Sequence, residues 1–126
     1  MSNVRRRGIG LFRTLAAMLP NAEHAVIEDA KVRDYLLSGS HPVGWFKSVV
    51  FIAVGYRSDA WPQLASDLLA LARTGHAVPS EMTPHGQKYE VSGKLTGPNG
   101  RVGQFKTVWI VRAGESFPRF VTAVPE

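Results

Sequence analysis

The sequence predicts an α+β fold in which three N-terminal helices pack on a C-terminal antiparallel meander sheet of three to four strands. Helix-type apolar spacing is confined to residues before Gly75. Strand-type segments rich in β-branched and aromatic residues follow from Gln87 onward. The connections between those segments are short, which favours antiparallel neighbours with the helices covering one face.

The first and third helices are predicted from polar residues at their starts and glycines at their ends. Glu28-Asp29 precedes apolar positions up to Leu37, so we expect a helix there that ends near Gly39. Ser58 or Asp59 would cap the third helix, which we expect over residues 60–74, with an apolar stripe typical of a packing helix.

The second helix is apolar on nearly every side, which is typical of a central, buried helix. Ser40 can cap it, with Pro42 in the first turn, where a missing N–H group is tolerated. We expect it to run to about Val54, with Gly55 as a left-handed stop. Within it, only Lys47 and Ser48 are polar between Trp45 and Ala53.

Three strands are predicted over residues 87–95, 102–112 and 119–124. The Asn99-Gly100 pair between the first two is a strong hairpin signal. The apolar segment 25–27 could add an edge strand. The proline-containing and glycine-containing segment 76–86 is predicted to be a loop that divides the helical half from the strand half.

The formal net charge of +5 is unevenly distributed along 126 residues. Residues 1–19 carry four arginines and no acid, and residues 87–126 carry six bases against three acids, whereas the middle has a slight acidic excess. This pattern suits a polyanionic partner, although such an excess also serves solubility. We expect residues 1–19 to be a basic arm or linker and residues 20–126 to form a single α+β domain.

Several classes of protein are excluded by composition. Without cysteine, the chain has no disulfide, thiolate metal site or cysteine nucleophile. Its four histidines show no metal-ligand spacing, so we expect no metal and no cofactor. Arg13 interrupts the apolar stretch of the arm, which argues against a signal peptide, and the stretch is too short to span a membrane.

Lys47 and His41 are the first candidates for chemistry. A lysine is rare in a buried helix unless its amine reaches solvent or meets an anion. His41 falls at the expected start of the same helix, where free N–H groups favour a phosphate or carboxylate. The alternative is structural: His41 belongs to the helix cap and the Lys47 amine extends into solvent.

The sheet supplies a second group of candidates. Alternation places Lys106, Val108, Ile110 and Arg112 on one face, and Phe105, Thr107, Trp109 and Val111 on the other. Basic and aromatic residues on neighbouring strands could bind RNA through phosphate contacts and base stacking. The same alternation is also what any half-exposed sheet shows. The residues concerned are Lys106, Trp109, Arg112, Arg119 and Thr122, with His85 and Lys88 at the start of the first strand.

Several short motifs resemble those of a small bacterial family classed as a domain of unknown function. The resemblance covers roughly residues 19–125 and leaves the arginine-rich arm outside. The motifs are Leu19-Pro20-Asn21-Ala22, Asp34-Tyr35-Leu36-Leu37, His41-Pro42-Val43-Gly44 with Lys47, Thr96-Gly97-Pro98-Asn99-Gly100-Arg101, Val108-Trp109-Ile110-Val111-Arg112 and Pro118-Arg119-Phe120-Val121-Thr122.

The order of helices and meander is also similar to the barnase/EndoU/colicin/RelE-like group of ribonuclease toxins. That resemblance implies metal-independent RNA cleavage in the cytoplasm by a toxin domain that is delivered within a larger secreted protein and held in check by a cognate inhibitor or immunity protein. It implies His41 as acid or base, Lys47 with Arg112 or Arg119 as phosphate stabilisers, and Thr122 as a positioning hydroxyl.

Two positions depart from the family pattern. Phe46 stands where a histidine is frequent, and Val124 where a tyrosine is frequent. If those residues are catalytic in relatives, this chain is inactive or works differently. The alternative hypothesis is a non-catalytic module that binds a protein or nucleic acid through the sheet and the arm.

Overall fold

The computed structural model describes residues 18–37 and 45–126, and it has the predicted α+β class. All three neighbouring strand pairs of the sheet are antiparallel, in the order β1-β2-β3-β4, so the predicted meander is confirmed. The elements are a 3₁₀ turn (Ala22–His24), a π-helical turn (Lys31–Leu36), α2 (Trp45–Ala53), a 3₁₀ turn (Ser58–Ala60), α3 (Trp61–Thr74), β1 (His76–Thr83), β2 (Gly86–Thr96), β3 (Val102–Arg112) and β4 (Pro118–Pro125).

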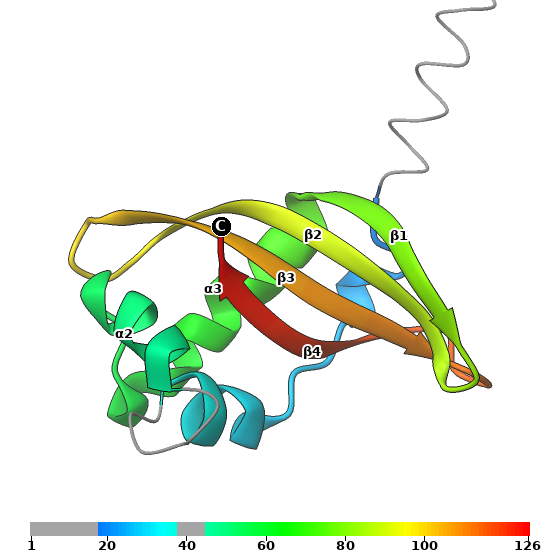
Figure 1. Cartoon of the computed structure of the whole chain (residues 1–126), viewed down its shortest axis with the longest axis horizontal. Coiled ribbons are helices and arrows are strands. Elements are labelled where there is room, and N and C mark those ends of the chain that lie inside the picture. Colours follow the sequence, from blue (N-terminus) through cyan, green and yellow to red (C-terminus); the bar gives the residue numbers. More distant parts are fainter. Residues whose placement is uncertain (1–17, 38–44) are drawn as a thin grey trace, which may run out of the picture.

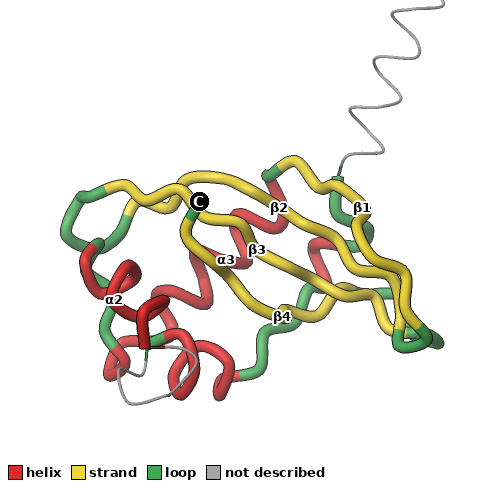
Figure 2. The backbone as a smooth tube through the Cα atoms, viewed as in Figure 1, coloured by secondary structure: helices red, strands yellow, loops and turns green. Residues whose placement is uncertain are grey.

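The helices gather on one side of the twisted sheet. In Figure 1, α3 crosses behind the strands, and α2 lies at the end of the sheet where the β2–β3 connection turns. The tube in Figure 2 shows the same separation between the helical layer and the strands. One face of the sheet is therefore covered by helices, and we call the opposite one the open face.

Alternation along β3 assigns residues to the two faces as predicted. Phe105, Thr107 and Trp109 are fully buried against the helical layer, whereas Lys106 and its alternate neighbours are partly exposed. Phe51 of α2 stacks on Phe105 with ring centroids 4.6 Å apart. The face of β3 that carries Phe105, Thr107 and Trp109 thus lines the core, and the face that carries Lys106 belongs to the open face.

The prediction of three N-terminal helices is wrong. The segment after Glu28-Asp29 forms only the six-residue π-helical turn Lys31–Leu36 instead of an α-helix. The start of α3 also differs, because Ser58 and Asp59 lie in a 3₁₀ turn and no side chain caps the helix. The helix ends before Gly55 and Gly75 are as expected. Among the described residues, no helix is long and apolar enough to span a membrane.

The predicted loop 76–86 is wrong too, since most of it is β1. Strand β1 is the edge of the sheet, and its register with β2 shifts between Pro79 and Met82. A proline cannot donate to a sheet ladder and is tolerated at edges and bulges. Pro79 therefore marked an irregular edge strand, and the connection to β2 is reduced to Pro84 and His85.

The apolar segment 25–27 contributes to the opposite edge. Val26 forms an isolated parallel bridge with Arg119 of β4. The N–H group of Val26 donates to the Pro118 carbonyl, and that of Phe120 donates to the Val26 carbonyl. The expected edge strand is thus a single bridge, which covers part of the outer edge of β4.

The β2–β3 turn closes the C-terminal end of α2. Asn99 donates from its side-chain amide to the Ala53 carbonyl at 3.0 Å and from its backbone N–H to the Val54 carbonyl at 3.4 Å. These are carbonyls that the end of a helix leaves unpaired. Gly97 packs so closely here that an added Cβ would lie 1.8 Å from the Val54 oxygen. The Thr96–Arg101 motif therefore has a structural role.

A buried polar chain links β2 and β3 inside the core. The Thr107 hydroxyl donates to the Val91 carbonyl at 2.7 Å and accepts from the Trp109 indole N–H at 2.8 Å. Each buried polar atom gains a partner, so the Trp109 ring can lie fully inside without an unsatisfied donor.

Replacing Thr107 with valine keeps the shape and removes the hydroxyl. We expect a loss of about 1–3 kcal/mol in the free energy of unfolding, because the Trp109 N–H is left buried without an acceptor. Urea denaturation measures this loss. The control is Thr96→Val at an exposed position, expected within about 0.5 kcal/mol of wild type; equal losses in both variants would contradict the account.

Candidate functional site

The open face contains a shallow hollow of about 610 Å³ at the end of the sheet where β2 begins and β3 ends. We call it the basic pocket, because three of its side chains are cationic or can become so. Its lining residues are Pro84, His85, Lys88, Ile110, Arg112, Ala113 and Val121. The structure thus brings together three of the candidate residues of the predicted sheet: His85, Lys88 and Arg112.

The β1–β2 turn positions His85 at the rim of this pocket. The N–H group of Ala113 donates to the His85 carbonyl at 3.0 Å, which ties the turn to the end of β3. On the other side, the His85 N–H donates to the Thr83 hydroxyl at 3.1 Å. Both bonds involve the backbone of His85, so its imidazole remains available to a ligand.

Gly86 sets the position of Arg112. The two residues are cross-strand partners, and a Cβ on Gly86 would lie 2.1 Å from the Val111 oxygen and 2.7 Å from the Arg112 Cα. Gly86 also has a φ of +145°, which other residues rarely adopt. Only glycine lets the turn residues approach this closely, and Arg112 therefore reaches the same pocket as His85.

The charge of the pocket is not compensated by ion pairs. Within the described part of the chain, neither Lys88 nor Arg112 has a carboxylate within 4.0 Å of its charged nitrogens. The apolar side chains of Ile110 and Val121 complete the lining. Two permanently charged side chains and an imidazole surround an apolar surface. This combination suits a ligand in which a phosphate group is joined to a less polar part.

Arg119 lies beside the pocket but is engaged elsewhere. It is the cross-strand partner of Ile110, which in turn faces Lys88. Its guanidinium makes two hydrogen bonds of 2.9 Å to the Glu115 carboxylate and lies 5.0 Å from the ring centre of Phe117. A phosphate would have to compete with Glu115 for this arginine.

Thr122 is placed one row further from the pocket. It pairs with Val108, whose partner on β2 is Glu90. Between the Val108 and Trp109 positions the register of β4 shifts, and the extra residue Val121 lines the pocket. A bulge of this kind can re-aim side chains near a functional site.

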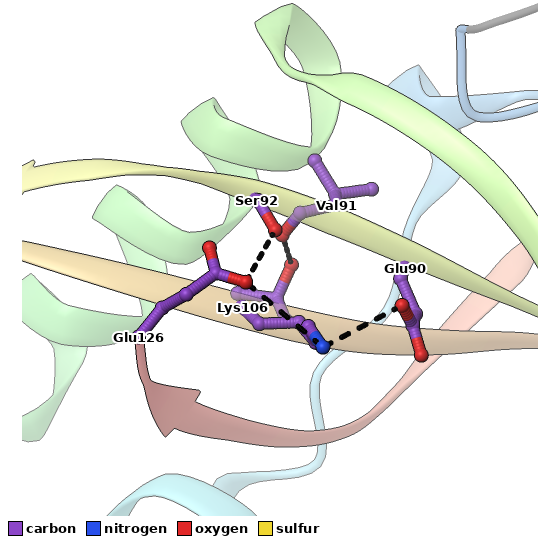
Figure 3. Close-up of polar contacts among 6 residues, drawn as sticks. Glu90, Val91, Ser92, Lys106 and Glu126 are labelled. Atoms are coloured by element: carbon purple, nitrogen blue, oxygen red, sulfur yellow. Dashed lines mark hydrogen bonds and ion pairs between the residues drawn. The ribbon is translucent and has the colours of Figure 1, made fainter.

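Lys106 lies on the open face two rows beyond Lys88, between two carboxylates. Its ammonium group is 3.8 Å from Glu90 and 3.9 Å from Glu126, and Figure 3 shows it between them. Ser92 donates to the same Glu126 carboxylate at 3.4 Å. Lys106 is not among the residues that line the basic pocket.

Trp109 was predicted to bind substrate, and its position in the structure speaks against that role. Its side chain is 0% exposed and packs edge-on against Phe120 with ring centroids 5.3 Å apart. No surface of the ring remains for a nucleic acid base, so Trp109 is a core residue.

The two candidates of the second helix are not located by this structure. His41 falls outside the described residues, and of Lys47 only the backbone position in α2 is described. Within the described ranges, histidines and carboxylates form no group of three that could hold a metal ion.

Sequence reasoning missed Ile110, Val121 and Glu115 as parts of this region. Alternation had already placed Ile110 beside Arg112, which was a usable signal. Glu115 lies in the connection before β4 and Arg119 four residues later in β4 itself, and only the fold of that connection brings their side chains together.

The ion pair between Glu115 and Arg119 should make the stability of the folded protein depend on pH. Hydrogen bonds from Arg119 are the main cause of the lowered pKa of Glu115, and the charge of Arg112 lowers it further. Because the folded-state pKa is below the unfolded one, the pair stabilises the protein above the unfolded pKa. This contribution is lost as the pH falls through the folded pKa.

Comparing Glu115→Gln with wild type from pH 7 to pH 3 by thermal denaturation tests this prediction. We expect the variant to be the less stable at pH 7 and the difference to vanish in acid. The control is the Arg119→Gln background, where adding Glu115→Gln should produce a much smaller pH-dependent difference, because only the charge of Arg112 then lowers the pKa of Glu115. A difference that persists at pH 3 would contradict the assignment.

Comparisons with known proteins place the chain in a family. A solved chain in a "Contact-dependent growth inhibition toxin - immunity protein complex from Klebsiella pneumoniae 342" has a TM-score of 0.64 and 21% sequence identity. The alignment covers 80% of this chain and 99% of that one, so the two share a fold. No curated protein sequence matches. The family model described as "Domain of unknown function (DUF6883)" matches residues 18–126, and the chain therefore belongs to that family.

Proposed function

We propose that this chain is a ribonuclease-like bacterial toxin domain that cleaves RNA without a metal ion. The observation that carries the proposal is the basic pocket, in which His85, Lys88 and Arg112 surround one apolar hollow without ion-pair partners among the described residues. The shared fold with a chain of a toxin and immunity protein complex supports the toxin context.

The pocket has the groups that phosphodiester cleavage needs. A base takes the proton of a ribose 2′-OH, whose oxygen then bonds to the adjacent phosphorus as the bond to the 5′-oxygen breaks. An acid returns a proton to that 5′-oxygen, leaving a 2′,3′-cyclic phosphate and a 5′-hydroxyl. In this proposal, Lys88 and Arg112 stabilise the added negative charge and His85 exchanges the protons, which is supported by their common position around the hollow.

The residues predicted from the resemblance take supporting places in this proposal. Arg119 and Thr122 lie on the rows of the open face next to the pocket, where they can contact the sugar or a neighbouring phosphate. His41 and Lys47 remain candidates for a second acid or base and a further cation. Lys106 takes no part, because its ammonium group lies between the carboxylates of Glu90 and Glu126.

The biological setting is part of the same proposal. A cognate inhibitor or immunity protein would neutralise the domain by covering the pocket, which requires acidic groups on the partner. Delivery as part of a larger secreted protein would bring the domain to the cytoplasm of a target cell, where RNA is available.

Incubating the purified chain with total RNA in EDTA tests the proposal. We expect cleavage with cyclic phosphate ends, reduced by about 10²-fold or more in His85→Ala and by about tenfold or more in Lys88→Gln and Arg112→Gln. Arg57→Gln is the matched control, because this arginine pairs with Asp59 in the 3₁₀ turn before α3. It should cleave like wild type.

Two outcomes would contradict the proposal. Absence of cleavage by the wild-type chain removes the ribonuclease function. Cleavage that survives in all three pocket variants but is lost in His41→Ala would assign the active site to His41 instead of the basic pocket.

A second function is favoured by a different observation. Val49 and Ile52 of α2 are 55% and 50% exposed, and residues three apart on a helix share a face. An exposed apolar pair of this kind suits docking of a partner protein. If the chain binds RNA or protein without cleaving RNA, it is a non-catalytic binding module.

A further inference from the structure

We propose that Glu90 and Glu126 limit the RNA site to the basic pocket, so that the domain holds one phosphate of a short single-stranded segment and not a strand laid along the sheet. This inference rests on the proposed function, since it names the extent of the substrate that the same site accepts. It assigns Lys106 to the boundary of the site and not to substrate binding.

The cross-strand register orders the open face into rows. The first two rows, Gly86 with Arg112 and Lys88 with Ile110 and Arg119, border the basic pocket. The third row is Glu90 with Val108 and Thr122, and the fourth is Ser92 with Lys106 and Val124. Neighbouring rows on one face are two residues apart, or about 7 Å.

The sign of the charge changes between the second and third rows. Among the described residues, neither Lys88 nor Arg112 has a carboxylate within 4.0 Å of its charged nitrogens, whereas Glu90 lies only one row beyond Lys88. At the fourth row, Glu126 contributes a second carboxylate through its contact with Lys106. A phosphate that follows the first one toward Ser92 would therefore meet two negative charges.

Lys106 cannot offset this repulsion of a second phosphate while its ammonium group is paired with Glu90 and Glu126. Glu90 and Glu126 both lie within 4.0 Å of its ammonium group, from the neighbouring strand β2 and from the residue after β4 (Figure 3). One positive charge between two negative charges leaves these two rows of the face with an acidic excess. Lys106 therefore helps to hold the three strands together and offers no net attraction to a polyanion.

Along β2, no other base of the open face continues the pocket in this direction, and Lys31 approaches β4 only from its outer edge, where its ammonium group donates to the Val121 carbonyl at 3.3 Å. Lys94, the next base along β2, lines a separate hollow of about 300 Å³ against α3, which it shares with Asp67. An RNA strand that enters the pocket would instead leave over the β1–β2 turn or the β3–β4 connection, at the near end of the sheet. That geometry fits a loop or a chain end.

Binding of two oligonucleotides tests the inference. The probes are a uridine dinucleotide with one phosphate and a uridine decanucleotide, both 2′-O-methylated so that they cannot be cleaved, titrated at low salt with the full chain. In Glu90→Gln/Glu126→Gln we expect decanucleotide affinity to rise roughly three- to tenfold, because the boundary is removed and Lys106 is released. Dinucleotide affinity should change less than about twofold, because its single phosphate does not reach the third row.

Three further variants separate this effect from net charge. Glu23→Gln/Glu81→Gln makes the same charge change at other places, and it should leave the ratio of the two affinities as in wild type. Lys106→Gln should change neither affinity by more than about twofold in the wild-type background. Added to Glu90→Gln/Glu126→Gln, it should reduce the gain but not abolish it, because the two carboxylates are still absent while the released cation is lost.

The possible results distinguish the inference from the proposed function. The inference is overturned if Glu90→Gln/Glu126→Gln leaves decanucleotide binding unchanged, if the charge control gives the same gain, or if Lys106→Gln alone weakens binding. In each of those cases Lys88→Gln and Arg112→Gln still weaken dinucleotide binding. If they do not, phosphate binding in the pocket fails and the inference fails with it.

Discussion

The unbroken antiparallel register between β2 and β3 is the constraint on which the rest of the structure depends. It runs without a bulge from the Gly86–Arg112 pair to the Thr96–Val102 pair. A shift by one residue would move every side chain of one strand to the other face. Trp109 would then leave the core and Lys106 would enter it, so burial of the apolar face and the charge pattern of the open face are specified together.

The two ends of this hairpin serve different parts of the molecule. At the turn, Asn99 pairs with the last carbonyls of α2, and Gly97 allows the close contact that this requires. At the opposite end, Gly86 allows the β1–β2 turn to approach Arg112, which forms the basic pocket. Two glycine-dependent contacts therefore connect the helical layer and the candidate site to the same pair of strands.

Much of the sheet could be predicted from local signals, because period-2 alternation and the Asn-Gly turn are properties of short segments. Contacts between residues that are distant in the sequence could not be predicted in this way, because they form only in the folded chain. Pro79 argued against a strand, yet an edge strand with a shifted register accommodates it. Trp109 looked like a stacking surface, but the Thr107 hydroxyl satisfies its N–H inside the core. The union of His85, Lys88 and Arg112 in one pocket depends on the close approach at Gly86.

The central claim is that the basic pocket binds a phosphate of RNA. Amide NMR spectra recorded during titration with the methylated uridine dinucleotide test it most directly. We predict saturable shifts at His85, Lys88, Arg112 and Ala113, with Lys106 and Ser92 unchanged and the response abolished in Arg112→Gln. Shifts confined to residues outside the pocket, or none at saturating dinucleotide, would contradict the claim.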